Sequence, residues 1–135
     1  MRTTFLQKVF FLFAIFLFAS IISFSQTITF CESVDSAGNA KNVSSTFAIG
    51  ANGGFINALV TLSNGINSNF VTYDVFAVNE DKSEEYESTI RQTIQPDFTW
   101  FSKEITFHKT GRYNVYVYDD KDRLLCVGRV TIKIE

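Results

Sequence analysis

The chain has 135 residues, of which 46% are hydrophobic and 19% charged, and its formal net charge at pH 7 is −2. This length is enough for one domain with a modest core. Lysines and arginines are spaced singly, so the composition excludes a basic surface of the kind that binds nucleic acid or anionic membranes.

The first 25 residues have the pattern of a secretory signal peptide. Arg2 and Lys8 precede an apolar run, Val9–Ile22, and Ser23 and Ser25 are small residues at the −3 and −1 positions of a cleavage site. A membrane-spanning helix needs about 20 apolar residues, and this run is shorter, although an uncleaved anchor remains the alternative. Cleavage leaves ten basic and 14 acidic residues, a net charge of −4. We therefore expect an exported protein, secreted or periplasmic, with no membrane association after cleavage.

From residue 26 onward, strand-like runs alternate with turn clusters, which is typical of a β-sandwich or barrel. Tyr86–Ile94 is ambiguous: its β-branched residues favour a strand, but the spacing of its apolar residues also fits a helix. The acidic stretch 79–87 is expected to be a loop or the frayed start of a strand. We expect a single all-β domain over residues 26–135, a sandwich of seven or eight mostly antiparallel strands. The other expected strands are Thr27–Cys31, with an extension to Val34, Ser44–Ile49, Phe55–Leu62, Phe70–Val78, Trp100–Phe107, Gly111–Asp119 and Leu124–Ile134.

The segment Phe107–Val117 contains a turn, then Gly111, one residue, Tyr113 and an alternating apolar run. This order resembles the corner found in immunoglobulin-like and fibronectin-like sandwiches of secreted bacterial proteins. The resemblance implies an immunoglobulin-like topology, in which Gly111 and Tyr113 form a structural corner and the Tyr113 hydroxyl bonds back across it. Cys126 does not occupy the usual position of an immunoglobulin cysteine.

The two cysteines, Cys31 and Cys126, lie in the expected first and last strands. An oxidising compartment allows them to pair, and the first and last strands of sandwiches are often neighbours. Strand phase argues against pairing, because Cys31 faces away from the core if Phe30 faces it, whereas Cys126 is on the apolar face of its strand. A disulfide and two free buried thiols both remain open.

Reactive groups that could form a catalytic site are sparse. His108 is the single histidine, no Gly-x-Ser-x-Gly elbow is present, and one histidine with two distant cysteines makes an incomplete zinc site. A small hydrolase would need His108 beside a carboxylate and a serine or cysteine in a cleft. We therefore expect no enzyme activity, no cofactor, and no catalytic or metal-binding residues.

Acidic residues form two groups, one within residues 80–87 and one within residues 119–122. Solvated loop charges explain both groups, and they also limit association between sheet edges. Calcium binding is the alternative, but neither group has the Asp-x-Asp-x-Asp-Gly pattern of a calcium loop.

Three aromatic residues lie opposite the expected core faces of their strands: Trp100, Tyr116 and Tyr118. They form the candidate binding surface, because aromatic rings anchor protein partners and stack on sugars. The structural alternative is that a neighbouring loop covers them. The expected function is non-catalytic binding or structural work with a protein or cell-surface partner. A carbohydrate-binding module is the alternative, and it requires the three rings to be coplanar and exposed on one face.

Overall fold

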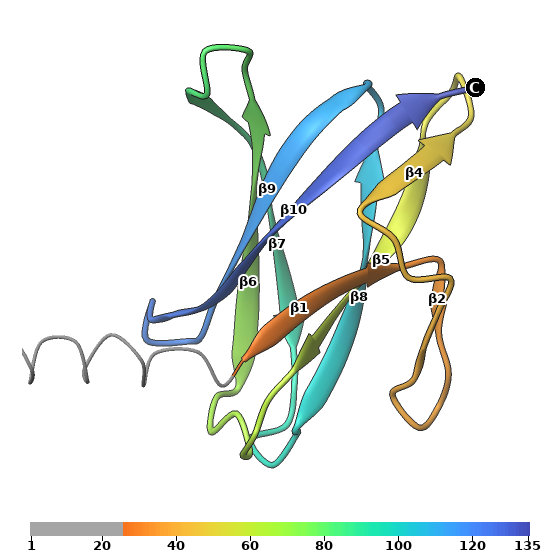
Figure 1. Cartoon of the computed structure of the whole chain (residues 1–135). Coiled ribbons are helices and arrows are strands. Elements are labelled where there is room, and N and C mark those ends of the chain that lie inside the picture. The colour runs from red at the N-terminus through yellow and green to blue at the C-terminus, as the bar shows by residue number, and fades with distance from the viewer. Residues whose placement is uncertain (1–25) are drawn as a thin grey trace, which may run out of the picture.

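The computed structural model describes residues 26–135, so the expected signal peptide lies outside the described residues (Figure 1). Every regular element in this range is a β-strand. The ten strands are β1 (Thr27–Cys31), β2 (Ser33–Val34), β3 (Ala40–Lys41), β4 (Thr46–Ile49), β5 (Gly54–Thr61), β6 (Phe70–Val78), β7 (Glu84–Thr93), β8 (Trp100–Phe107), β9 (Gly111–Tyr118) and β10 (Leu124–Ile134). The described part of the chain contains no helix of the length and apolarity that a membrane crossing requires.

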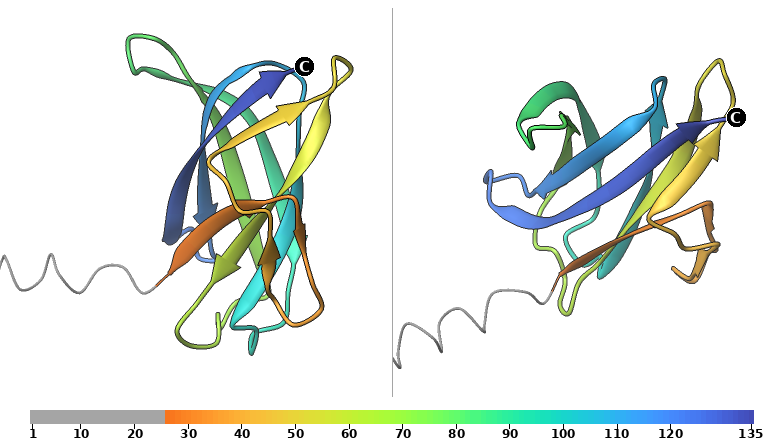
Figure 2. Two further views of the ribbon diagram at one scale, coloured as in Figure 1. Left: turned by 45° about the vertical axis from the view of Figure 1, so that its right-hand side comes forward. Right: turned by 45° about the horizontal axis from the view of Figure 1, so that its top comes forward.

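The strands form two sheets that face each other across the core (Figure 2). One sheet has three strands in the order β1-β5-β8, and the other has five in the order β4-β10-β9-β6-β7. All pairings are antiparallel except that of β10 with β4. The expected all-β sandwich is therefore confirmed, with one difference in number. The extra strands are the two-residue pair β2 and β3, of which β2 lies in the expected extension to Val34 and β3 was not expected.

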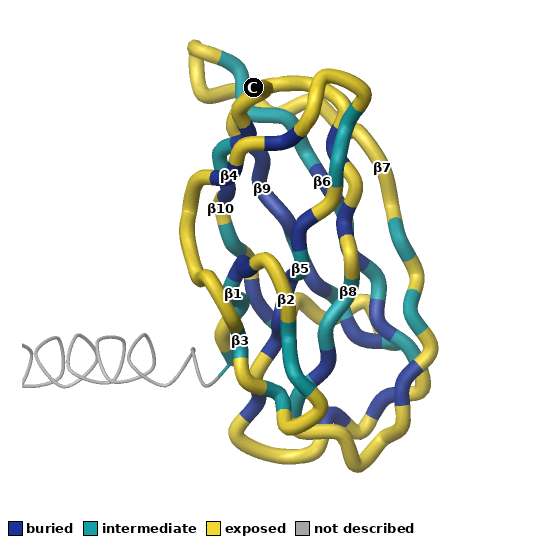
Figure 3. The backbone as a smooth tube through the Cα atoms, turned by 90° about the vertical axis from the view of Figure 1, so that its right-hand side faces the viewer, coloured by how far each residue is buried: buried dark blue, intermediate teal, exposed yellow. Residues whose placement is uncertain are grey.

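The ambiguous segment Tyr86–Ile94 is a strand as far as Thr93: it belongs to β7, which pairs with β6 along its whole length. Of the two alternatives for residues 79–87, a loop extends to Ser83 and the start of a strand applies from Glu84, where β7 begins. This strand forms the edge of its sheet, where acidic side chains stay in water while the backbone pairs on one side only. Figure 3 shows β7 mostly in the colour of exposed residues.

The core fills the space between the sheets, and its alternation follows the sequence pattern. Tyr73 of β6 is completely buried. Its hydroxyl donates to the Gln92 side-chain oxygen (2.6 Å), and the Gln92 amide donates to the Ser102 carbonyl (2.8 Å). This chain of bonds ties the five-stranded sheet to β8. Gly128 allows β1 to approach β10, because a Cβ there would lie 2.5 Å from the Ile28 side chain.

The corner between β8 and β9 has the geometry that the resemblance implied. The Tyr113 hydroxyl donates to the Lys109 carbonyl oxygen at 2.8 Å, and the Tyr113 ring lies 4.7 Å from that of Phe107. Gly111 begins β9 with a φ of 151°, a conformation that suits glycine. In antibody domains a cysteine stands two residues after this tyrosine; here that residue is Val115, which is completely buried.

The outer face of the three-stranded sheet is covered in part by its own chain. The β2–β3 hairpin lies beside β1 and β5 in Figures 1 and 2. Cys31 and Leu59 are buried on this face, outside the central core cluster. Gly38, at the tip of the hairpin, has a φ of 85°, and a Cβ there would lie 2.6 Å from the Trp100 ring. The hairpin is therefore packed tightly against the ring.

Candidate functional site

The three aromatic residues expected to form one surface are divided between the two sheets. Trp100 lies on β8, on the outer face of the three-stranded sheet, half-buried under the tip of the β2–β3 hairpin. Tyr116 and Tyr118 lie on β9, on the outer face of the five-stranded sheet. The expectation of one surface was therefore wrong. Alternation predicted correctly that each ring lies opposite its core face, but it could not predict which sheet each strand joins.

Tyr116 and Tyr118 instead belong to a different cluster on the five-stranded sheet. The register pairs Val127 with Tyr116, Leu124 with Tyr118, and Tyr86 with Phe76, and directly paired residues share one face of a sheet. Tyr86, Leu124 and Val127 are 61%, 52% and 47% exposed. We call these six residues the aromatic face. Its members are Phe76, Tyr86, Tyr116, Tyr118, Leu124 and Val127.

Phe76 is the centre of the aromatic face, with one tyrosine on each side. Its ring centroid lies 5.8 Å from that of Tyr86 and 5.4 Å from that of Tyr116, and both pairs meet edge to face at 75° and 81°. Such T-shaped pairs are attractive, because the ring edge of one residue points to the face of another. They do not form the coplanar platform that the carbohydrate alternative required.

The carboxylate of Glu84 holds Tyr116 of β9 in place. One oxygen of Glu84 accepts hydrogen bonds from the Tyr116 hydroxyl (2.7 Å) and the Asn114 amide (2.9 Å). Arg129 completes the network by donating to the Asn114 side-chain oxygen at 3.0 Å. The hydrogen bonds from Tyr116 and Asn114 lower the pKa of Glu84, so this acceptor is ionised at neutral pH. The network fixes these side chains before any partner arrives.

A second polar chain holds the most exposed ring. The Tyr86 hydroxyl shares a hydrogen bond with the Thr89 hydroxyl at 2.7 Å, and Thr89 donates to an Asp74 carboxylate oxygen at 2.7 Å. Nearby on the same sheet, the guanidinium of Arg91 lies 3.5 Å from the centroid of the Phe70 ring. Both tyrosines that flank Phe76 are thus held at the hydroxyl and at the ring edge.

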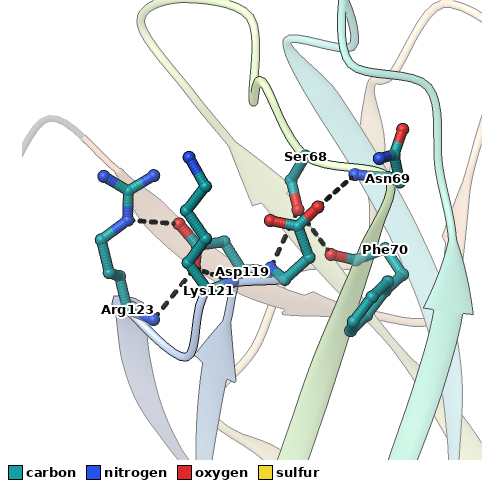
Figure 4. Close-up of polar contacts among 7 residues, drawn as sticks. Ser68, Asn69, Phe70, Asp119, Lys121 and Arg123 are labelled. Carbon is teal, nitrogen blue, oxygen red and sulfur yellow. Dashed lines mark hydrogen bonds and ion pairs between the residues drawn. The ribbon is translucent and has the colours of Figure 1, made fainter.

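The acidic residues 119–122 form a structural turn at the end of the β9–β10 hairpin (Figure 4). Buried Asp119 accepts from the backbone N–H groups of Lys121 and Arg123, both at 2.9 Å, and from the Arg123 side chain at 2.8 Å. Burial by itself would raise the pKa of Asp119, but these bonds outweigh it and lower the pKa. Both oxygens of this carboxylate are thus occupied by N–H donors, so the residue stabilises the turn.

The neighbouring Asp120 joins this turn to the loop before β6. Its carboxylate accepts from the Asn69 backbone N–H at 3.0 Å, and its own N–H donates to the Ser68 hydroxyl at 2.9 Å. Ser68 is 2% exposed and donates in turn to the Phe70 carbonyl at 2.7 Å. Within residues 26–135, no group of three His, Cys, Asp or Glu side chains is placed to hold a metal ion.

Both cysteines are buried and free, so the disulfide left open by the sequence is not formed in this structure. The strand-phase argument explains why. Cys126 belongs to the core cluster, whereas Cys31 lies on the other side of the three-stranded sheet, next to the hairpin. Burial raises the pKa of both thiols, that of Cys126 to about 12.

His108 lies in the exposed corner between β8 and β9 and lines a cavity of about 310 Å³ that also contains Glu87 and Ser88. No hydrogen bond joins the three side chains among the described residues; the His108 ring packs on Gly53 instead. The arrangement expected for a hydrolase, a histidine bonded to a carboxylate and to a nucleophile, is not assembled there.

No protein-family model matches the chain, and no curated protein matches it in sequence. Solved structures do match it. An immunoglobulin-like protein from Pseudomonas aeruginosa aligns with a TM-score of 0.52 and 15% identity, over 79% of this chain and 92% of that one. The soluble domain of PmoD from Methylocystis (TM-score 0.47, 11% identity) is matched over 79% of this chain and 90% of its own. A superoxide reductase (neelaredoxin) from Ignicoccus hospitalis aligns with a TM-score of 0.42 and 12% identity, over 83% of this chain and 81% of that one. At these identities the first match shows the fold alone: the domain is an immunoglobulin-like β-sandwich.

Sequence reasoning missed four members of the aromatic face: Phe76, Tyr86, Leu124 and Val127. Tyr86 stands in the acidic stretch expected to be a loop or a frayed strand start, and Phe76 lies in an expected strand whose neighbours the sequence does not give. A signal for Val127 was present, because it is apolar and one residue out of phase with Cys126. Leu124 has the same phase as Cys126, and only the register shift between these two residues brings it to the outer face.

Proposed function

We propose that this protein is a non-catalytic binding domain, exported from the cytoplasm, that engages a protein on a cell surface or in the periplasm through its aromatic face. The observation that carries this proposal is the exposure of the face. Tyr86, Leu124 and Val127 are each about half exposed or more, and Phe76, Tyr116 and Tyr118 lie between Tyr86 on β7 and the other two on β10, on a sheet whose opposite side forms the core. Interfaces between proteins are enriched in aromatic residues and arginine.

The hydrogen-bond networks support the same proposal. Binding costs free energy when mobile side chains become ordered. Tyr116 and Tyr86 are already held by Glu84 and by Thr89, so this cost is reduced for both rings. An aromatic face with fixed rings and charged groups, here Asp74 opposite Tyr116 and Arg129 opposite Asn114, suits a folded protein partner with its own apolar patch and polar groups.

A protein partner fits better than a carbohydrate. A sugar ring stacks on a flat aromatic surface, whereas the rings around Phe76 meet at 75° and 81°. Exposed aliphatic side chains, Leu124 and Val127, add contact area that a polar sugar does not use. Trp100, which the carbohydrate alternative needed, lies on the other sheet.

Export is proposed from the pattern of residues 1–25, and intact-mass measurement of the protein released by the producing cells tests it. A mass corresponding to residues 26–135 supports cleavage. The full-length mass in a membrane fraction supports the uncleaved anchor instead.

The binding proposal is tested with the triple variant Tyr86→Ala, Leu124→Ser, Val127→Ser. All three side chains are exposed, so the fold should remain, while retention of the partner from the exported protein fraction should fall more than about tenfold, as for loss of interface hot spots. The matched control is Phe98→Ser, which changes a 41% exposed aromatic residue outside the aromatic face. Equal retention of the partner by the triple variant and the wild type would show that the aromatic face is not the binding site.

A further inference from the structure

A groove between β4 and β5 forms a second concave surface, separate from the aromatic face. Its volume is about 690 Å³. Phe47 and Ile56 are buried at its base, and the exposed side chains of Val43 and Phe55 (60% and 55%) stand in its walls. Its lining contains the carboxylates of Glu32 and Glu135 and no lysine or arginine. The lining is therefore mixed, with apolar side chains among polar ones and acidic charges only, which suits a ligand that is both apolar and cationic.

The topology explains why the groove is open. β4 and β5 are joined by a tight turn in which the Gly53 N–H donates to the Gly50 carbonyl at 3.0 Å. From this turn the two strands enter different sheets, β4 beside β10 and β5 beside β8. β1 pairs with β5 only as far as Asn57, so residues 54–56 of β5 have a neighbouring strand on one side only.

The backbone of β4 offers hydrogen-bonding groups to this groove. The Thr131 N–H donates to the Ser45 carbonyl (2.8 Å) and the Glu135 N–H to the Ile49 carbonyl (3.1 Å). Because residues of a parallel strand alternate in the side to which they bond, Thr46 and Ala48 direct their N–H and C=O groups away from β10. The Ser44 hydroxyl donates to the Thr46 carbonyl (2.8 Å) and accepts from its N–H (3.1 Å). Among the described residues, no side chain caps Ala48 in this way.

We propose that the groove binds an extended segment of a protein partner that contains alternating apolar and basic residues. The segment pairs with the open edge of β4 at Ala48, as in other recognition by strand addition. Its apolar side chains contact Val43 and Phe55, and its basic side chains lie near Glu32 and Glu135. Charge complementarity selects this occupant, since residues 26–135 have a net charge of −4 and the groove has only acidic charges. This site is independent of the aromatic face and of the function proposed for it.

The test uses the purified, ¹⁵N-labelled protein and a fluorescent heptapeptide of alternating lysine and valine. The proposal predicts amide chemical-shift changes that centre on Ala48 and reach Val43 and Phe55. The double variant Glu32→Gln, Glu135→Gln should weaken binding about 3- to 10-fold, a loss that shrinks with added salt as expected for exposed charge pairs. The control Val127→Ser, on the aromatic face, should bind the peptide like the wild type.

A second variant tests the backbone pairing. Ala48→Pro removes the N–H that points into the groove and leaves the bonds to β10 in place, so it should abolish peptide binding if its circular dichroism is unchanged; if it does not fold, the double glutamine variant decides. Three results would overturn the proposal. They are equal binding of a matched glutamate–valine heptapeptide, shift changes located elsewhere, and a dimer in light scattering whose interface is this groove, which would make a second copy the occupant.

Discussion

The outer faces of the two sheets have similar sequence patterns but differ in how far their apolar residues are exposed to solvent. On the three-stranded sheet, the outward residues Cys31, Leu59 and Trp100 are covered by the β2–β3 hairpin. On the five-stranded sheet, the outward residues of the aromatic face include side chains up to 61% exposed. An apolar residue opposite the core face can thus serve either stability or binding. The chain that packs over it, and not its own strand, decides which.

The two outer faces also differ in the interactions that hold their side chains. Under the hairpin, packing of Trp100 against Gly38 excludes water and adds to the folding free energy. On the aromatic face, bonds such as that from Tyr116 to Glu84 are exposed to solvent and contribute little to stability. The role of these exposed hydrogen bonds is to fix the positions of the side chains.

Thiol reactivity should differ most between folded and unfolded protein. Both thiols are buried with raised pKa values, so little thiolate is present at pH 8, and the thiolate is the reactive form. We expect alkylation at least about a hundredfold slower in buffer than in urea, where two thiols per chain react. Mass spectrometry gives the count. Fewer than two reactive thiols in urea without reductant would indicate a disulfide between Cys31 and Cys126.

The variant Trp100→Ala should lower the free energy of unfolding by about 2–3 kcal/mol, because a large half-buried ring is removed from under the hairpin. Urea denaturation measures this value. Alkylation of Cys31 should also become faster than that of Cys126, since the hairpin covers only the former. The control is Phe98→Ala, close in sequence but exposed, with an expected loss below about 1 kcal/mol. Equal losses for the two variants would show that the hairpin is not a stabilising cover.

The variant Asp119→Ala should cost about 2 kcal/mol, because it removes a charged acceptor of three N–H groups at the end of the β9–β10 hairpin. The pKa of Asp119 is lower in the folded chain than its ordinary value of 3.8. Its stabilising contribution is therefore complete above pH 3.8 and is lost as the pH falls through the folded-state pKa. Asp119→Asn should accordingly show a shallower loss of stability below pH 4 than the wild type. An unchanged acid profile would contradict this role.

The variant Tyr113→Phe should cost about 1 kcal/mol, the usual value for one hydrogen bond, because it removes only the hydroxyl that bonds to the Lys109 carbonyl. Thermal denaturation detects this difference. Tyr118→Phe is the matched control on the same strand, and it should leave the melting temperature nearly unchanged. A larger effect of Tyr118→Phe would mean that the hydroxyl on the outer face of the sheet stabilises the fold more than the Tyr113 hydroxyl at the corner, which would contradict the role given to Tyr113.

The smallest expected effect is on the aromatic face. Tyr86→Ala should change the free energy of unfolding by less than about 0.5 kcal/mol, since the side chain is 61% exposed. The same variant should weaken partner binding, because exposed tyrosines of this kind are frequent hot spots. A loss of stability as large as that of Trp100→Ala would mean that the aromatic face stabilises the fold as much as the residues under the hairpin do.

Much of the fold follows from the sequence pattern. Phe70–Val78, Trp100–Phe107 and Leu124–Ile134 have the bounds that alternation predicts, because a half-buried strand repeats every two residues. The start of β7 at Glu84 was not predictable in this way. An edge strand pairs through its backbone and can carry exposed charged residues, so its side chains give no alternating signal.

The candidate site was less predictable than the fold. The contact between Phe76 and its two tyrosines depends on the order β9-β6-β7 in the sheet. It also depends on a register shift between Val75 and Phe76, which pairs Phe76 with Tyr86. Neither is encoded in local periodicity. For the same reason Trp100 could be assigned to an outward face but not to a sheet, and its covering hairpin lies in a run of Asp, Ser and Gly that is typical of a loop.

We propose that the outer face of the five-stranded sheet is open for a protein partner, whereas the β2–β3 hairpin covers Cys31, Leu59 and Trp100 on the other outer face. Site-specific photo-crosslinking in the producing cells tests it most directly, with a benzophenone amino acid placed once at Tyr86 and once at Ser36, an exposed residue of the covering hairpin. We expect a discrete protein adduct from position 86 that the substitutions Leu124→Ser and Val127→Ser abolish, and none from position 36. An adduct from position 36 alone, or one from position 86 that survives both substitutions, would contradict it.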